Sequence, residues 1–161
     1  MNKYGGKRQF IYLAGNISKD NRTYQWREVF ADLMKHDPVV ILNPCDNAFN
    51  RQYRELHRME LEDEACKLVK DSQGILRLKD FQMVKIASVV VMNLVLFELD
   101  RPMVGTIVEH TWAVDVLNVP IIGIVGDGKG PYSEHSWLTR PLAAMVEDIE
   151  EAVYVIRRYF L

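Results

Sequence analysis

The sequence predicts an α/β fold in which a mostly parallel, doubly wound sheet of four to five strands is flanked by helices. Short apolar runs of strand length alternate along the chain with longer segments of helical periodicity. One run, residues 89–94 (VVVMNL), is apolar at nearly every position, as expected of a parallel strand covered by helices on both faces. Rossmann-like and flavodoxin-like proteins have this arrangement. We expect residues 1–161 to form a single domain, because the sequence has no linker or repeat.

The first part of the chain predicts a strand, a helix and a second strand. Residues 9–14 (QFIYLA) form an apolar run that ends at Gly15. Residues 23–35 repeat apolar side chains at the three- and four-residue spacing of one helical face. Residues 39–42 (VVIL) are mostly β-branched and are followed by Asn43-Pro44, where proline ends regular structure.

A charged segment fills the middle of the chain. Residues 47–70 have few apolar members and are expected to include a long, partly exposed helix, which residues 72–74 would break. Residues 76–87 again have a helical pattern and lead into the strand at residues 89–94.

The last third predicts a helix from Gly105-Thr106 to about Val116 and a strand at residues 120–125. A glycine-rich loop comes next, and residues 138–161 contain two helical patterns.

The glycine-rich segment, residues 123–130, matches a phosphate-binding P-loop through its lysine. The match fails at Gly130, which stands where a serine or threonine would hold Mg²⁺, and Pro131 follows where a helix should begin. We therefore predict a surface loop.

Composition limits the classes of partner. With 48% hydrophobic residues, 26% charged residues and a formal net charge of -2, the chain gives no electrostatic reason to bind nucleic acid. Its longest apolar run, residues 86–97, is shorter than the ~20 residues that cross a bilayer. The apolar stretch at residues 10–14 is too short for a signal peptide. We expect a cytoplasmic protein without a membrane or nucleic-acid partner.

Neither the cysteines nor the histidines have the spacing of metal ligands. Cys45 and Cys66 form no C-x-x-C pair, and the four histidines share no such spacing. We therefore expect no metal and no cofactor.

The residues that follow the predicted strands are the first candidates for a site, because ligands bind beyond the carboxyl ends of parallel strands. These residues are Gly15-Asn16, Asn43-Pro44, Asn93 with residues 98–106, and residues 126–130.

Thr106 and Glu109 have the spacing of a capping box, in which both side chains bond to free amides at a helix start. A purely structural role is one interpretation. A carboxylate in the first helical turn would also be kept ionised by the helix dipole, as a nucleophile must be.

The order of short motifs resembles the nucleoside 2-deoxyribosyltransferase family over nearly the whole chain. The fragments that carry the resemblance are residues 11–15 (IYLAG), 26–27 (WR), 43–44 (NP), Asp80, residues 86–94 (IASVVVMNL), 102–113 (PMVGTIVEHTWA) and 135–138 (HSWL).

The resemblance implies an enzyme that moves 2-deoxyribose from a deoxynucleoside to another nucleobase. On this basis Glu109 attacks the anomeric carbon and forms a covalent ester, with the logic of a retaining glycosidase. Asp80 matches an aspartate that contacts the base and manages its proton, and Tyr12 matches a tyrosine near the nucleophile. The resemblance further implies a pocket lined by Gly15, Asn16, Asn93 and Gly105.

Two positions depart from better-known members of the family. Met103 and Ser88 stand where some members carry aspartates, which leaves open the group that protonates the leaving base. Asp100 or Glu98 could reach the site from the same loop.

Structural interpretations of the other candidates stay open. Asp80 could lie on an exposed helical face, Asn93 could bond to backbone at a strand end, and Tyr12 could be a core residue. Basic side chains after the first strand could bind a 5'-phosphate if they converge, or could be solvated charges; these are Lys19, Arg22 and Arg27.

Two alternative functions follow. A deoxynucleoside 5'-monophosphate N-glycosidase would use the same nucleophile and let water resolve the ester. A non-catalytic nucleotide-binding module would need no chemistry at Glu109.

Since the resemblance implies active sites at subunit contacts, we expect a homodimer or larger assembly, with the C-terminal segment reaching toward its neighbour. Exposed Trp137, Tyr154 and Tyr159 would suit such an interface, although they could equally pack internally.

Overall fold

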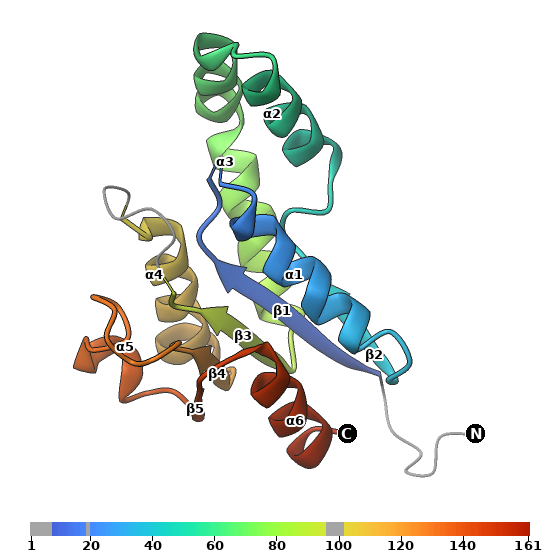
Figure 1. The fold of residues 1–161 in the computed structure, drawn as a ribbon, viewed down its shortest axis with the longest axis vertical. Coiled ribbons are helices and arrows are strands. Elements are labelled where there is room, and N and C mark those ends of the chain that lie inside the picture. Colours follow the sequence, from blue (N-terminus) through green and yellow to red (C-terminus); the bar gives the residue numbers. More distant parts are fainter. Residues whose placement is uncertain (1–7, 19, 96–101) are drawn as a thin grey trace.

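A computed structural model describes residues 8–18, 20–95 and 102–161. Its centre is a five-stranded sheet with the strand order β2-β1-β3-β4-β5, in which each neighbouring pair is parallel (Figure 1). The strands are β1 (Gln9–Gly15), β2 (Val39–Leu42), β3 (Val89–Asn93), β4 (Ile121–Ile124) and β5 (Ala144–Val146). The helices are α1 (Arg22–Leu33), α2 (Ala48–Arg58), α3 (Glu62–Ile86), α4 (Val104–Thr111), a π-helix η1 (Trp112–Leu117), α5 (Ser136–Thr139) and α6 (Ile149–Tyr159). The predicted fold class is confirmed.

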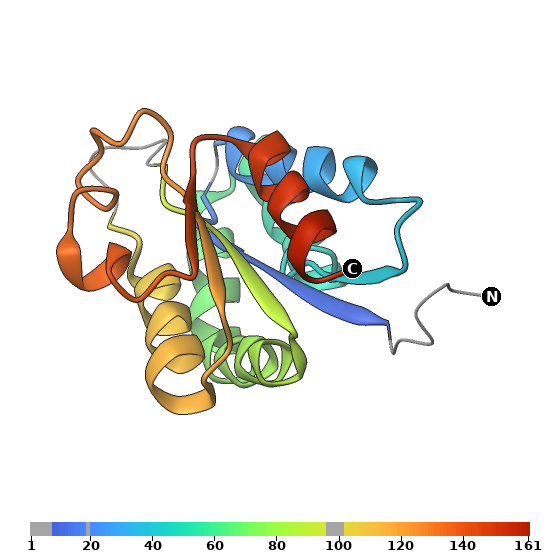
Figure 2. The same ribbon diagram turned by 90° about the horizontal axis from the view of Figure 1, so that it is seen from below.

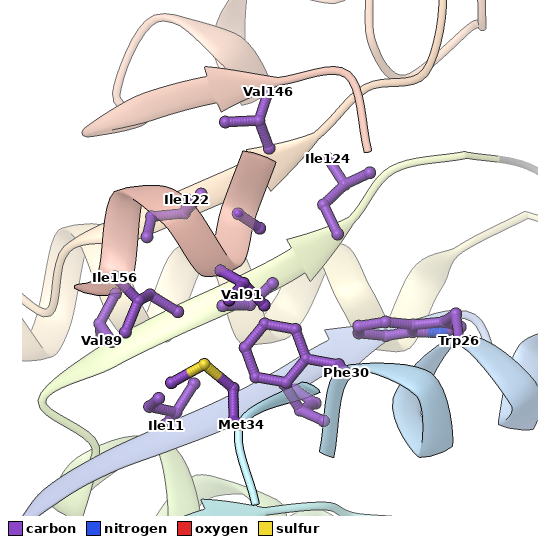
Figure 3. Packing of buried hydrophobic residues seen from close by; sticks show 13 residues of the cluster. Ile11, Trp26, Phe30, Met34, Val89, Val91, Ile122, Ile124, Val146 and Ile156 are labelled. Carbon is purple, nitrogen blue, oxygen red and sulfur yellow. The ribbon is translucent and has the colours of Figure 1, made fainter. Parts of the chain in front are cut away.

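The helices cover both faces of the sheet, because side chains along each strand alternate between the faces. Ile11 and Leu13 of β1 belong to a core cluster with side chains of α1 and α6, whereas Tyr12 and Ala14 belong to a cluster with side chains of α3 and η1. Figure 2 shows α1 and α6 on one side of the sheet and α3 and α4 on the other. In Figure 3, Phe30 and other large side chains fill the first layer.

The charged middle segment differs from the prediction. It forms two helices, α2 and α3, and the chain turns between them where Glu60 has a φ of 59°. The break predicted at residues 72–74 is wrong, since these residues lie inside α3. The helix continues through Gly74, although a glycine in a helix interior costs about 1 kcal/mol relative to alanine.

The C-terminal region also differs from the prediction of two helices. Only α6 is a long helix; Ala144–Val146 is instead the edge strand β5, and α5 is a single turn. Pairing with β4, in which Ile122 lies opposite Ala144, imposes the extended conformation on this short segment. Tertiary contacts therefore override its helical pattern.

The strand order places a topological switch point between β1 and β3. The chain leaves β1 toward β2 on one side, whereas β3 continues toward β4 on the other side. At such a point the connections diverge and leave a crevice beyond the carboxyl ends of the two strands. No helix among the described residues is long and apolar enough to span a membrane.

Candidate active site

A cavity of about 290 Å³ lies at this switch point. Its walls come from the end of β1 and the residues after it, from α3, and from the start of α4. The lining residues are Gly15, Asn16, Ile17, Asp80, Pro102, Met103, Val104, Gly105, Thr106 and Glu109. The structure thus brings five of the predicted site residues to one cavity, and Tyr12 contacts it through Glu109.

Tyr12 and Glu109 are joined by a short hydrogen bond. The alternation along β1 turns Tyr12 toward the face covered by α3 and α4. There its hydroxyl donates to Oε1 of Glu109 over 2.6 Å. Tyr12 is fully buried and Glu109 is 7% exposed. Burial, with the nearby Glu109 carboxylate, raises the pKa of Tyr12 well above its usual value, so the phenol stays a hydrogen-bond donor.

Burial dominates the titration of Glu109. Removal from water disfavours the charged form and raises the pKa of Glu109 to about 8. The hydrogen bond from Tyr12 opposes the rise, Asp80 adds to it, and the positive charges of Arg27 and Lys79 oppose it. The expectation that the helix dipole keeps this carboxylate ionised is therefore wrong.

The predicted capping box is also wrong. The helix α4 begins at Val104, one turn earlier than Thr106 would require, and Met103 occupies the cap position without a side-chain hydrogen bond. Glu109 consequently lies in the second turn, and its carboxyl group accepts from Tyr12. Because it is not engaged in capping, one carboxyl oxygen can face the cavity.

Asp80 lies on the buried side of α3 and not on an exposed helical face. Burial raises the pKa of Asp80, while the charges of Lys79 and Arg27 lower it. Lys79 Nζ lies 3.1 Å from Asp80 Oδ1 and donates to the carbonyl of Pro44 over 2.7 Å. Lys79 was not predicted from the sequence, because adjacent helical residues do not normally face each other.

Arg27 is fully buried, so the interpretation as a solvated charge is wrong. Its guanidinium donates to the carbonyls of Leu13 over 3.4 Å, Gly15 over 2.8 Å and Asn16 over 3.3 Å, and also to that of Thr23. These bonds fix the backbone that leaves β1. Its remaining bonding capacity is too small for Arg27 to serve as the main phosphate ligand.

Gly15 and Asn16 line the cavity in different ways. A Cβ atom on Gly15 would lie 3.1 Å from the ring of Trp26 and 3.4 Å from Asn93, so glycine permits a close approach here. The side chain of Asn16 is 8% exposed, and its Nδ2 has no hydrogen-bond partner among the described residues. A bound ligand would satisfy this donor.

Asn93 lies opposite Gly15 in the sheet but is not part of the cavity lining. Its Oδ1 accepts from the backbone N–H of Val95 over 3.0 Å, which agrees with the structural interpretation of a strand-end side chain. The substrate-binding role of Asn93 stays a prediction.

The two departures from the family pattern have different consequences. Met103 is buried in the cavity wall. Ser88 precedes β3, at the end of the sheet opposite the cavity, and its Oγ accepts from Phe10 N over 3.2 Å. Asp100 and Glu98 lie outside the described residues.

The possible phosphate ligands after β1 do not converge in the described part of the chain. Arg22 forms an ion pair with Asp20 over 2.6 Å, and Lys19 lies outside the described residues. The segment predicted to be a loop after β4 has turns at Gly126 and Gly128, both with positive φ, and Gly123 lies inside β4. Among residues 8–18, 20–95 and 102–161, no group of histidine, cysteine and acidic side chains is arranged to hold a metal ion.

Comparison with solved structures finds a similar fold. The 2-desoxiribosyltransferase from Leishmania mexicana matches with a TM-score of 0.61 over 95% of this chain and 99% of that chain, at 18% sequence identity. Neither a protein-family model nor a curated protein matches the chain. The likeness shows a common α/β architecture.

Proposed function

We propose that this protein transfers a 2-deoxyribosyl group between nucleobases through a covalent ester on Glu109. The observation that carries the proposal is a buried carboxyl that accepts a hydrogen bond from Tyr12 and lines, together with Asp80, a cavity at the switch point of the sheet. The proposal is supported by the resemblance of the motifs and by the fold shared with a 2-desoxiribosyltransferase. The cavity, about 290 Å³, has a volume near the lower end of the ~300–1,000 Å³ found for small-molecule sites.

In the first step, an ionised Glu109 oxygen attacks the anomeric carbon of the deoxynucleoside. The carbon–nitrogen bond breaks, its electron pair stays with the leaving base, and the base takes up a proton. Tyr12 bonds to one carboxyl oxygen and so orients the other toward the sugar. Charge develops on the sugar as in a glycosidase, and the carboxylate stabilises it.

Among residues 8–18, 20–95 and 102–161, Asp80 is the carboxyl group placed to supply that proton. Burial raises its pKa, which favours a carboxylic acid that can donate, and it lines the same cavity as Glu109. In the second step an incoming base attacks the same carbon, the ester bond returns its electron pair to Glu109, and the base gives its proton back to Asp80.

Product analysis with purified protein tests the proposal. Thymidine plus adenine should yield deoxyadenosine and thymine. Glu109→Gln keeps a carbonyl acceptor for Tyr12 but removes the nucleophile, so the exchange should fall by at least about 10⁴-fold. Glu150→Gln, a matched change at an exposed position of α6, should leave the rate unchanged.

The same assay separates the alternatives. Thymidine 5'-monophosphate that yields thymine and deoxyribose 5-phosphate without base exchange would assign the protein as an N-glycosidase in which water resolves the ester. Binding without any Glu109-dependent product would favour the non-catalytic module.

We also propose that residues 1–161 act as one domain and that the protein assembles as a homodimer or larger oligomer in the cytoplasm. Trp137 is 83% exposed, and Tyr154 and Tyr159 are exposed as well, which favours the interface over internal packing for these side chains. Sedimentation equilibrium should give a mass of at least twice the 18.7 kDa of one chain.

A further inference from the structure

A second and larger cavity, about 770 Å³, lies away from Glu109. It is bounded by the start of α1, by α2 and by the beginning of α3, near the top of Figure 1. The arginine, tyrosine and histidine side chains of its lining are Arg51, Arg54, Arg58, Tyr24, Tyr53 and His57. Its volume falls within the range of small-molecule sites, and the proposed transferase reaction makes no use of it.

The three arginines lie on one side of α2, because residues three, four and seven positions apart share a helical face. Like charges at this spacing destabilise a helix unless they have partners. Arg58 has a partner in Glu55. Arg51 lies 3.5 Å from Asp46, but both side chains are largely exposed and the pair contributes little.

Arg54 differs from its neighbours because no carboxylate pairs with it in the described part of the chain. Its Nη2 donates to Oδ1 of Asn21 over 3.3 Å, and its guanidinium lies 4.4 Å from the centre of the Tyr24 ring. A planar guanidinium held against an aromatic ring keeps its other donors free for a bidentate acceptor. Two carboxylates line the cavity, and neither pairs with Arg54: Glu55 pairs with Arg58, and Oε2 of Glu62 lies 3.0 Å from Nδ1 of His57.

Tyr24 supplies an independent observation. It lines the cavity and is only 4% exposed, yet its hydroxyl has no hydrogen-bond partner among the described residues. A buried hydroxyl without a partner costs about 1–3 kcal/mol. An acceptor group bound beside Arg54 would remove that cost.

We propose that this cavity binds the phosphate group of a small molecule through Arg54, with Tyr24 beneath it and Arg51 and Arg58 at its edge. A guanidinium matches phosphate oxygens in a bidentate geometry. Ser18 and Asn21 line this cavity, while Gly15 at the end of β1 and Asn16 directly after it line the cavity of Glu109. The phosphate belongs either to a substrate that reaches both cavities or to a separate ligand.

Calorimetric titration of the full chain with inorganic phosphate and with thymidine 5'-monophosphate tests the proposal. Arg54→Gln should weaken binding of both by roughly tenfold or more, since one charge-assisted contact pair is lost. Arg54→Lys should bind with intermediate affinity. Arg158→Gln, the same change at an exposed position of α6 at the other end of the molecule, should bind as the wild type does (Figure 1).

Binding in the presence of thymidine identifies the source of the phosphate. Competition between thymidine and thymidine 5'-monophosphate, with inorganic phosphate unaffected, indicates one substrate that reaches both cavities. Simultaneous binding indicates a separate ligand.

The proposal is overturned if the wild type binds no phosphate, if Arg54→Gln binds it equally well, or if Arg158→Gln loses as much affinity. Glu109→Gln should retain phosphate binding, so failure of the proposed transferase reaction would not be mistaken for failure of this site.

Discussion

Glu109 receives one strong hydrogen bond, from Tyr12, and little else that would offset the loss of water around its carboxyl group. Arg27 and Lys79 act on it only through their charge. A nucleophilic carboxylate in such a place is reactive once ionised, because solvent does not stabilise its charge. The cost is that the ionised form is scarce at neutral pH.

This environment predicts an unusual pH dependence of base exchange. The proposed reaction needs Glu109 ionised, and the pKa of Glu109 is raised to about 8, so kcat/KM should fall as the pH drops below about 8. Tyr12→Phe removes a hydrogen bond that lowers the pKa of Glu109. The acid limb of this variant, which is the fall of kcat/KM toward low pH, should therefore move to higher pH. The same change should reduce kcat/KM by roughly tenfold or more.

A pH profile of kcat/KM for both proteins between pH 5 and 10 provides the measurement. An acid limb near pH 4.5, or the same limb in Tyr12→Phe, would contradict this account of the carboxyl group.

Arg27 is expected to act as a positioning residue rather than as a ligand. Arg27→Met would leave the carbonyls of Gly15 and Asn16 without their donor and should reduce the free energy of unfolding by roughly 2–4 kcal/mol. Arg158→Met, on the surface of α6, should change it by less than about 0.5 kcal/mol. Urea denaturation measures both.

The pH profile distinguishes positioning from mere stability. Arg27 lowers the pKa of Glu109 through its charge, so Arg27→Met should shift the acid limb upward, whereas Arg27→Lys should restore it. An unshifted limb in Arg27→Met would limit Arg27 to a purely structural role.

At the scale of elements, the start of α4 serves both the helix and the cavity. Gly105 lies in the first turn, and a Cβ atom there would meet no other atom within 4 Å. Gly105→Ala should therefore stabilise the protein, or leave its stability unchanged, with a gain of up to about 1 kcal/mol from helix propensity. The added methyl group would enter the cavity that Gly105 lines; if this cavity holds the substrate, as proposed, KM should rise about tenfold.

Gly74→Ala is the matched control for this prediction, because Gly74 lies in a helix with the same open surroundings but far from the cavity lining. It should gain stability without a change in KM. Thermal denaturation and steady-state kinetics of both variants check the expectation; an unaltered KM in Gly105→Ala would mean that substrate does not contact the start of α4.

The strands that the sequence predicts best are those with an unbroken run of apolar or β-branched residues. Residues 89–94 form a strand within a residue of the predicted bounds, and all five residues of β3 are buried. Residues 39–42 also form the predicted strand, although β2 is a half-buried edge strand; its β-branched residues and the following Asn43-Pro44 indicate the strand there. The edge strand β5 carries only three residues, two of them not buried. Its pattern is too short to compete with a helical interpretation, and pairing with β4 decides its conformation.

The candidate site was predictable only in part. The resemblance predicted Tyr12, Asp80 and Glu109 as site residues. In the structure Asp80 and Glu109 line one cavity and Tyr12 donates a hydrogen bond to Glu109, although their roles stay predictions. Lys79 was missed, and Arg27 was predicted only as a phosphate ligand or a solvated charge, because their roles depend on burial and on bonds to distant backbone. For Arg27 a signal existed, since it sits next to Trp26 on a helix whose apolar residues face the core.

At the scale of the whole molecule, burying Glu109 has a cost for folding that varies with pH. The pKa of this group is about 8 in the folded protein and 4.5 in its unperturbed state. Between these values the folded chain holds a proton that the unfolded chain has lost. The stability that this proton provides is fully present below pH 4.5 and is lost as the pH rises through about 8, at roughly 1.4 kcal/mol per pH unit.

Glu109→Gln should remove this loss, because glutamine has no proton to release and can still accept the hydrogen bond from Tyr12. Urea denaturation at pH 5, 6, 7 and 8 should show the free energy of unfolding of Glu109→Gln rising relative to the wild type by about 1 kcal/mol per pH unit. Glu150→Gln, exposed on α6, should run parallel to the wild type. A constant difference between Glu109→Gln and the wild type would show that the carboxyl group is ionised throughout this range, and the acid limb of kcat/KM would then have to arise from another group. The stability and kinetic measurements therefore report on one protonation event, and they must agree if Glu109 is both the buried acid of the fold and the nucleophile of the reaction.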